Sequence, residues 1–168
     1  MNNIKECEES IEYILGNILC NNKLTISTAE SCTGGMIAAK LISYPGISSS
    51  FLEGAITYSN EAKIKRLGVK KETLDTYGAV SKETAKEMVE GIARESSSNT
   101  SIATTGIAGP GGGTKEKPVG LVYIAVHMNG YTKVEKCNFN GGREEVRMAA
   151  TNYALEMLKN ELIKNNYK

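Results

Sequence analysis

Residues 101–114 read Ser-Ile-Ala-Thr-Thr-Gly-Ile-Ala-Gly-Pro-Gly-Gly-Gly-Thr, and they join a short apolar run to a glycine-rich loop. Five glycines fall within residues 106–113, and an apolar run resumes at Val119. Because glycine has no Cβ, such a backbone can approach a ligand closely and direct several N–H groups at one anion. Two interpretations follow: a ligand cradle or a flexible hairpin connection. Thr104 and Thr105 at the strand end favour the cradle, because open α/β sheets bind ligands there.

Segments typical of helices and strands alternate on both sides of this loop. Apolar periodicity predicts helices over 4–19, 36–42, 61–67, 71–76, 81–94 and 144–163. Apolar runs predict strands over 24–29, 51–58, 101–105, 119–127 and 131–139. Asn129-Gly130 is typical of a two-residue hairpin turn. This order predicts a three-layer α/β/α sandwich on a mixed, mostly parallel sheet with a C-terminal β-hairpin.

Composition excludes several classes of protein. A length of 168 residues suits a single domain over 1–168, and 40% hydrophobic residues are ordinary for a soluble globular chain. The formal net charge is +1 without a long basic run, so nucleic acid is not an expected partner. No apolar stretch reaches membrane-spanning length, and the first residues are too charged for a signal peptide, so we expect a cytoplasmic protein without a membrane partner. The four scattered cysteines predict reduced thiols.

Histidine and aspartate are scarce, and this narrows the chemistry. The chain has one histidine, His127, and one aspartate, Asp75, and neither lies beside a serine in a glycine turn. A metal site built on histidines would lack ligands, and we expect no metal or cofactor. If the protein is a hydrolase, its base is expected to be a lysine, glutamate or tyrosine.

Polar residues follow the first two predicted strands. Ser31, Gly34 and Gly35 lie on a strand-to-helix turn, where free N–H groups and a hydroxyl could bind an anion or stabilise an oxyanion. The alternative is that Ser31 only caps the helix. Tyr58 ends the second strand and Lys63 lies in the first turns of the next helix. The helix dipole and burial would both lower the pKa of Lys63 and make it a base, whereas a solvated surface lysine is the alternative.

Two further segments are candidates for holding a ligand. The glycine loop lacks the GxxxxGK[ST] spacing of a P-loop, so it is a generic cradle for phosphate or substrate. Arg143 stands just before the last helix, where it can reach a phosphate or a carboxylate. The alternative for Arg143 is an exposed ion pair with Glu144 or Glu145.

Four ordered motifs together resemble one family. They are Thr28-Ala29-Glu30-Ser31-Cys32-Thr33-Gly34-Gly35, Tyr58-Ser59-Asn60-Glu61-Ala62-Lys63, Gly78-Ala79-Val80-Ser81 and Thr105-Gly106-Ile107-Ala108-Gly109-Pro110-Gly111-Gly112. Over about residues 5–160 the chain is similar to the CinA C-terminal domain family, which includes nicotinamide mononucleotide deamidases. The resemblance implies an amidohydrolase that converts nicotinamide mononucleotide to nicotinate mononucleotide and ammonia in pyridine nucleotide salvage. It also implies a homo-oligomer.

The resemblance assigns a role to each matching residue. Ser31 would be the nucleophile or a water-orienting hydroxyl, Lys63 the base, and Tyr58 an aid to proton transfer. Substrate contacts are expected from Gly34, Gly35, Ser48, Thr105, Gly106, Gly111, Gly112 and Arg143. The family often reads Gly-Asp-Arg where this chain has Gly141-Gly142-Arg143, so a carboxylate that could orient Arg143 is missing. The alternative function is a non-catalytic nucleotide-binding or interaction module associated with competence or DNA damage.

Overall fold

A five-stranded sheet forms the centre of the molecule. The structure is a computed structural model, and it describes residues 10–168. The strands lie in the order β2-β1-β3-β4-β5. They comprise β1 (Ile26–Glu30), β2 (Phe51–Ile56), β3 (Thr100–Gly106), β4 (Leu121–Met128) and β5 (Tyr131–Asn138). β1 is parallel to β2 and β3, whereas β4 is antiparallel to both β3 and β5. The mixed sheet and its C-terminal hairpin are confirmed.

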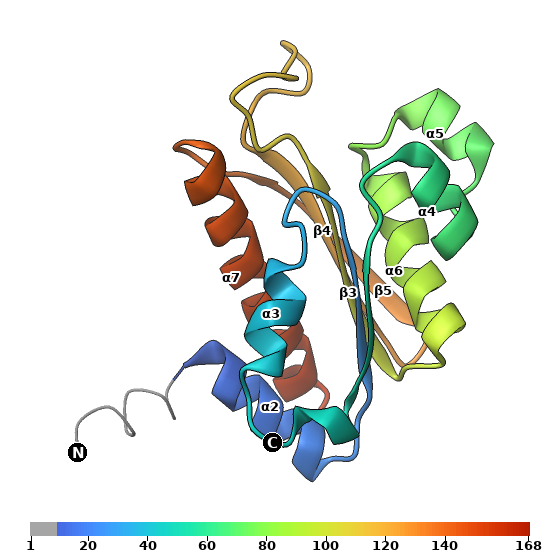
Figure 1. Cartoon of the computed structure of the whole chain (residues 1–168). Coiled ribbons are helices and arrows are strands. Elements are labelled where there is room, and N and C mark those ends of the chain that lie inside the picture. Colours follow the sequence, from blue (N-terminus) through green and yellow to red (C-terminus); the bar gives the residue numbers. More distant parts are fainter. Residues whose placement is uncertain (1–9) are drawn as a thin grey trace.

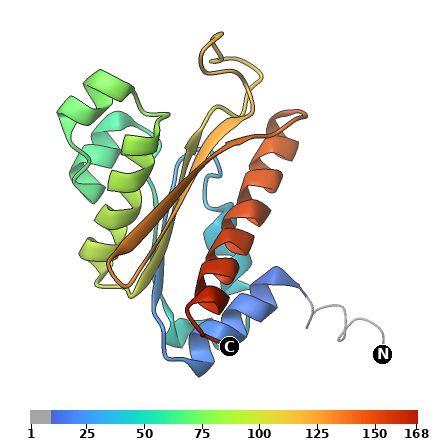
Figure 2. The ribbon, with the colours of Figure 1, turned by 180° about the vertical axis from the view of Figure 1, so that it is seen from behind.

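Helices cover both faces of this sheet, which confirms the three-layer sandwich (Figures 1 and 2). One face carries α2 (Ile11–Asn21), α3 (Met36–Ile42) and α7 (Arg143–Lys164). The other carries α6 (Lys82–Ser96), on which α4 (Asn60–Leu67) and α5 (Lys71–Tyr77) pack. A 3-10 helix, η1 (Ile47–Ser49), precedes β2. The predicted helix over 4–19 is observed from Ile11 onward; Ser10 precedes it in an extended conformation, and residues 4–9 lie outside the described part of the chain.

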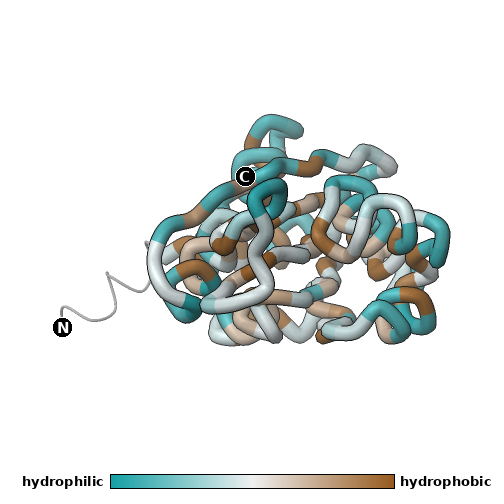
Figure 3. The backbone as a smooth tube through the Cα atoms, turned by 90° about the horizontal axis from the view of Figure 1, so that it is seen from above, coloured by the Kyte–Doolittle hydropathy of each residue, from teal (hydrophilic) through white to brown (hydrophobic). Residues whose placement is uncertain are grey.

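The core has one apolar cluster on each side of the sheet. Ile26, Ile102 and Ile124 face α2, α3 and α7, whereas Ala29 and Ala103 face α6. In Figure 3 most hydrophobic segments of the tube lie in the interior and the outer loops are mostly hydrophilic. The side chains of β1 are buried along its whole length, as expected for a central strand covered by helices on both faces. This rigid central strand leads directly into Ser31.

Two local features agree with their sequence signals. Asn129 and Gly130 both have positive φ, at 51° and 80°, which is the geometry of the predicted hairpin turn.

β2 ends at Ile56, two residues before the predicted end, because the chain leaves the sheet there and Ser59 precedes the first turn of α4. The Ser59 hydroxyl accepts a hydrogen bond from the Ala62 N–H at 3.1 Å. α4 therefore begins at a fixed point beside the carboxyl ends of β1 and β2.

Candidate active site

Ser31 and Lys63 meet at the carboxyl edge of the sheet. Ser31 follows β1, and Lys63 lies in α4, which follows the neighbouring strand β2. The Lys63 Nζ atom is 3.2 Å from Ser31 Oγ and 2.7 Å from the carbonyl oxygen of Thr57. The Lys63 side chain is buried, with 1% of its surface exposed, and Ser31 is 9% exposed. The two residues are far apart in sequence, and the parallel strands bring them together.

Burial sets the protonation of this pair. Loss of solvent lowers the pKa of the Lys63 amine below its ordinary value, whereas a negative charge on the nearby Cys32 sulfur would act in the opposite direction. Within residues 10–168, Lys63 forms no ion pair with a carboxylate that would hold its proton. Burial also raises the pKa of the Cys32 thiol to about 11, so this thiol stays neutral at physiological pH. The arrangement therefore places a buried amine with a lowered pKa next to a hydroxyl.

The lowered pKa of Lys63 predicts how stability changes with pH. Between the folded pKa and the unfolded value of 10.5, the unfolded chain binds more protons at this residue than the folded chain does. The free energy of unfolding of the wild type, measured relative to Lys63→Met, should therefore rise as the pH increases from the lowered folded-state pKa of Lys63 towards 10.5. Urea unfolding of both proteins at several pH values measures this difference. A difference that stays flat or falls would show that the folded amine keeps its ordinary pKa.

The turn that carries Ser31 differs from its prediction in one respect. The Gly34 N–H donates to the carbonyl oxygen of Ser31 at 3.2 Å, and the Gly35 N–H donates to Glu30 Oε2 at 2.9 Å. The expectation that these N–H groups are free to bind an anion is therefore wrong, because the Glu30 carboxylate already occupies the start of α3. Both positions still require glycine, since their φ angles are +61° and +96°.

Arg143 connects two segments at the rim of the site. Its Nη1 donates to the carbonyl oxygen of Gly109 in the glycine loop at 2.9 Å, and its Nη2 donates to the hydroxyl of Tyr58 at 3.0 Å. Among residues 10–168 it forms no ion pair, and Glu145 instead accepts the Gly142 N–H at 2.6 Å. The guanidinium charge thus has only neutral partners. Tyr58 is 63% exposed and contacts Arg143, and the structure does not bring its hydroxyl into the hydrogen bonds of the Ser31–Lys63 pair.

The remaining glycine-loop residues lie in two settings. The Thr105 side chain is buried and donates to the carbonyl oxygen of Ala79 at 2.7 Å. A Cβ at Gly106 would lie 2.7 Å from the carbonyl oxygen of Leu121, so close strand packing already explains this glycine. Gly111 and Gly112 are exposed in the loop that joins β3 to β4. The loop is thus a hairpin connection whose exposed part remains available to a ligand.

Ser48 lies apart from the other predicted site residues. It belongs to η1, which precedes β2, whereas Tyr58 and Lys63 follow that strand. A strand of six residues spans about 20 Å at about 3.3 Å per residue. The structure therefore does not bring Ser48 to Ser31 within one chain.

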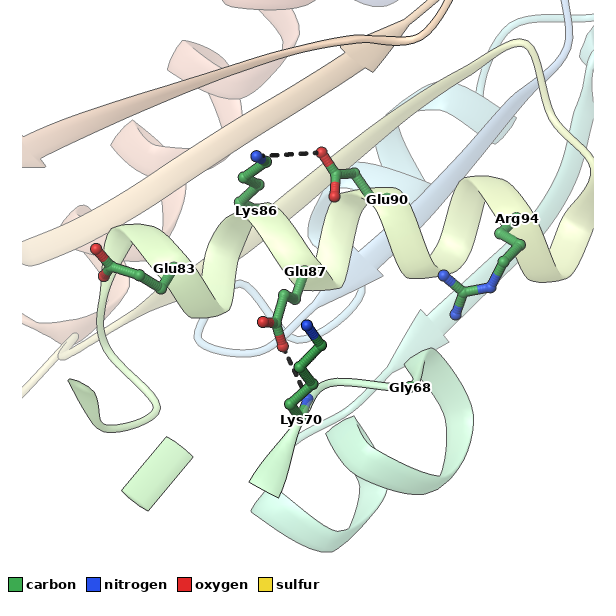
Figure 4. A pocket seen from close by; sticks show the side chains of 7 residues that line it. All are labelled: Gly68, Lys70, Glu83, Lys86, Glu87, Glu90 and Arg94. Atoms are coloured by element: carbon green, nitrogen blue, oxygen red, sulfur yellow. Dashed lines mark hydrogen bonds and ion pairs between the residues drawn. The ribbon is translucent and has the colours of Figure 1, made fainter. Parts of the chain in front are cut away.

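A groove between α6 and the segment after α4 is lined by none of the predicted site residues (Figure 4). Two of its three acidic residues have partners within the chain: Glu87 accepts the Lys70 N–H at 2.8 Å, and Glu90 lies 3.9 Å from Lys86. In the part of the chain that the structure describes, no three acidic, cysteine or histidine residues are grouped so as to hold a metal ion. No helix of residues 10–168 is long and apolar enough to cross a bilayer. The contacts of Ser31 with Lys63, and of Arg143 with Tyr58 and Gly109, make this edge of the sheet the candidate site.

Comparison with known proteins assigns the chain to a family. The model of the CinA C-terminal domain matches residues 8–162. The chain belongs to the CinA C-terminal domain family. Competence-damage inducible proteins of Clostridium acetobutylicum and Clostridium perfringens are 57% and 58% identical over 93% and 95% of this chain. These matches cover 38% and 39% of the relatives, so the chain spans about two fifths of their length.

Solved CinA structures share the fold. The competence/damage inducible protein from Agrobacterium tumefaciens is 46% identical with a TM-score of 0.85, over 88% of this chain and 93% of that chain. The competence damage-inducible protein A from Klebsiella pneumoniae is 35% identical with a TM-score of 0.88, over 91% and 95% of the two chains. The names of these CinA proteins state no reaction.

Sequence reasoning missed two residues of this CinA site. Glu30 precedes Ser31 in its motif, and its carboxylate accepts hydrogen bonds from N–H groups in the first turn of α3, which follows in the chain. Arg147 donates to the carbonyl oxygens of Cys32 and Thr33 at 3.1 and 3.0 Å. Arg147 follows Arg143 by four residues, so both lie on one face of α7, and this spacing was the available signal.

Proposed function

We propose that this chain hydrolyses the carboxamide of nicotinamide mononucleotide, giving nicotinate mononucleotide and ammonia. The observation that carries the proposal is the buried Lys63 amine at 3.2 Å from the Ser31 hydroxyl. A serine beside a desolvated lysine is a combination suited to attack on an amide carbonyl. The resemblance of the motifs around these two residues supports the same reaction.

The first half of the reaction uses Lys63 as a base. A neutral amine has two N–H donors and one lone pair, so Lys63 can donate to the Thr57 carbonyl while its lone pair accepts the Ser31 proton. As that proton moves, Ser31 Oγ forms a bond to the carboxamide carbon and the carbonyl electron pair moves to oxygen. When the intermediate collapses, the C–N bond breaks and the Lys63 ammonium returns the proton to the leaving nitrogen. Ammonia departs, and an ester on Ser31 remains.

In the second half of the reaction, water takes the place of Ser31 as the nucleophile and Ser31 becomes the leaving group. Lys63 takes a proton from a water molecule, whose oxygen attacks the ester carbon. The ester C–O bond breaks, the proton returns to Ser31 Oγ, and the nicotinic acid group of the product gives its remaining proton to solvent, so that nicotinate mononucleotide leaves as the carboxylate. No oxidant, reductant or further reactant is needed for this balance. Lys63 therefore serves as base and acid in both halves.

Arg143 is the proposed partner of the substrate phosphate. Among the described residues its guanidinium bonds only to the Tyr58 hydroxyl and the Gly109 carbonyl, both neutral, so a phosphate would be a stronger acceptor for it. The exposed Gly111 and Gly112 would line the same side of the ligand. We place Tyr58 with Arg143 at this end of the substrate, and the part in proton transfer that the sequence predicts for Tyr58 stays a prediction.

Replacing Arg143 by alanine should weaken substrate binding more than it slows the chemical step. Loss of a charge-assisted contact to phosphate should raise KM by about 10- to 100-fold and change kcat by less than about threefold. Nicotinamide riboside, which lacks the phosphate, should be hydrolysed equally well by the variant and the wild type. Arg66→Ala, on the exposed pair with Glu53, is the control. Equal losses for both substrates would remove Arg143 from the phosphate site.

The proposed function is tested by incubating the purified chain with nicotinamide mononucleotide. One ammonia and one nicotinate mononucleotide should appear for each substrate consumed. The rival function, a non-catalytic nucleotide-binding module, predicts that the nucleotide raises the melting temperature without release of ammonia. The competence-damage names of the relatives are compatible with this rival. Thermal stabilisation and ammonia release measured on the same sample distinguish the two functions.

A further inference from the structure

A buried carboxylate holds the donor groups of the turn that carries Ser31. The Glu30 side chain, 1% exposed, accepts four hydrogen bonds. The Thr33 hydroxyl donates at 2.7 Å, and the N–H groups of Gly35, Ile37 and Ala38 donate at 2.9, 3.1 and 2.9 Å. Within residues 10–168, no cation forms an ion pair with Glu30. Its charge is therefore compensated by the turn and the start of α3.

A guanidinium holds the acceptor groups of the same turn. Arg147 Nε donates to the carbonyl oxygen of Cys32, and Arg147 Nη2 donates to that of Thr33. In the described chain Arg147, like Glu30, forms no ion pair. The two charged side chains come from different elements, the end of β1 and the first turns of α7. The turn is thus bound from two sides. Glu30 accepts hydrogen bonds from its donor groups, and Arg147 donates to its carbonyl oxygens.

Strand β3 provides a third attachment. The Ser31 N–H donates to the carbonyl oxygen of Thr104 at 3.0 Å, and the hydroxyls of Thr33 and Thr104 lie 2.8 Å apart. The Thr33 hydroxyl therefore joins Glu30 to β3. With the backbone of Ser31 held in this way, its side chain points to Lys63.

We propose that Glu30 and Arg147 are positioning residues that keep Ser31 Oγ within reach of Lys63 Nζ. This inference rests on the proposed function. Irregular backbone with two left-handed glycines has no regular hydrogen-bond ladder of its own, so side chains must fix its conformation. A displacement of about 1 Å at a reacting group can cost about 100-fold in rate. Neither residue needs to touch the substrate for this effect.

The test compares variants of Glu30 and Arg147 with matched variants in other regions of the chain. Glu30→Gln replaces one acceptor oxygen by an amide donor that faces N–H groups, and Arg147→Met removes both donors, whereas Arg147→Lys keeps the charge. Glu161→Gln is the control for the acid, because Glu161 is also buried and pairs with Lys133 at the far end of α7. Arg94→Lys is the control for the arginine, because Arg94 donates to the carbonyl oxygen of Leu67 in another region.

The readout is the rate at which an alkyl fluorophosphonate labels Ser31, together with kcat and KM for nicotinamide mononucleotide. All assays are run well below each variant's melting temperature. Glu30→Gln and Arg147→Met should each slow labelling and lower kcat by about 100-fold, with KM within about threefold of the wild type. Arg147→Lys should recover part of the loss. Both control variants should label at the wild-type rate even if their melting temperatures fall.

Each outcome bears on the inference. Glu30→Gln and Arg147→Met proteins that are labelled at the wild-type rate would overturn it, as would controls that are slowed equally. If Glu30→Gln does not fold, the comparison of Arg147→Met with Arg147→Lys tests the inference. A wild type that labels rapidly but releases no ammonia, with the two variants slowed, would keep the positioning role and reject the proposed substrate. A wild type labelled no faster than Ser31→Ala would overturn the reactive serine and the inference together.

Discussion

Replacing Ser31 by alanine is expected to lower kcat for nicotinamide mononucleotide by at least about 10³-fold, because the variant cannot form the ester intermediate. KM should change little, since Arg143 and the glycine loop are untouched. Within the described chain the Ser31 side chain takes part in one hydrogen bond, which its Oγ accepts from the buried Lys63 amine, so the variant should still fold. Circular dichroism and the melting temperature check the fold, and ammonia release measures kcat.

A covalent adduct gives a second measurement on the same variant. The intact mass of wild-type protein quenched during turnover should show a fraction carrying the nicotinoyl nucleotide ester, and Ser31→Ala should show none. Ser43→Ala is a suitable control, because the exposed Ser43 hydroxyl only donates to the Lys40 carbonyl after α3. An alanine variant with wild-type turnover would exclude Ser31 as the nucleophile.

Replacing Lys63 by methionine is expected to lower kcat by about 10²- to 10⁴-fold, which is the range for loss of a general base. Methionine keeps a long side chain in the buried space but cannot take the Ser31 proton. The remaining rate should no longer show the titration of the amine. Lys65→Met in the same helix, where the side chain is exposed, is the control and should retain the wild-type kcat.

The outcome of the Lys63 substitution also separates two interpretations of the buried amine. If Lys63 were only a structural residue, the variant would change stability and leave kcat close to the wild-type value. A kcat within about threefold of the wild type, in a variant that melts as expected, would contradict its role as base.

Much of the fold could be predicted from the sequence, because the apolar spacing of a helix and the residues at its ends depend only on residues close together in the chain. Helix α3 has the bounds that its apolar spacing indicated, and Ser59 and Gly68 begin and end α4 as their residue types predict. The meeting of Ser31 with Lys63 follows from topology, since both come after neighbouring parallel strands. The sequence places both residues after predicted strands, and the structure adds that these two strands are neighbours.

The details that could not be predicted depend on where single side chains reach. The N–H groups at the start of α3 were expected to be free, but the preceding Glu30 folds back onto them, and no spacing rule indicates that rotamer. Thr105 was expected to contact substrate, yet its hydroxyl is used by the Ala79 carbonyl of a segment that is distant in sequence. Ser48 was predicted to contact substrate through family resemblance alone. The structure places it before β2, at the opposite end of that strand from Lys63.

The pH dependence of Ser31 labelling tests the Ser31–Lys63 pair most directly, because it requires no assumption about the natural substrate. The labelling rate of the wild type with an alkyl fluorophosphonate should rise with pH and level off at the pKa of Lys63, below the ordinary value of 10.5. Lys63→Met should label slowly and show no such plateau. Identical pH profiles for the two proteins would contradict the account.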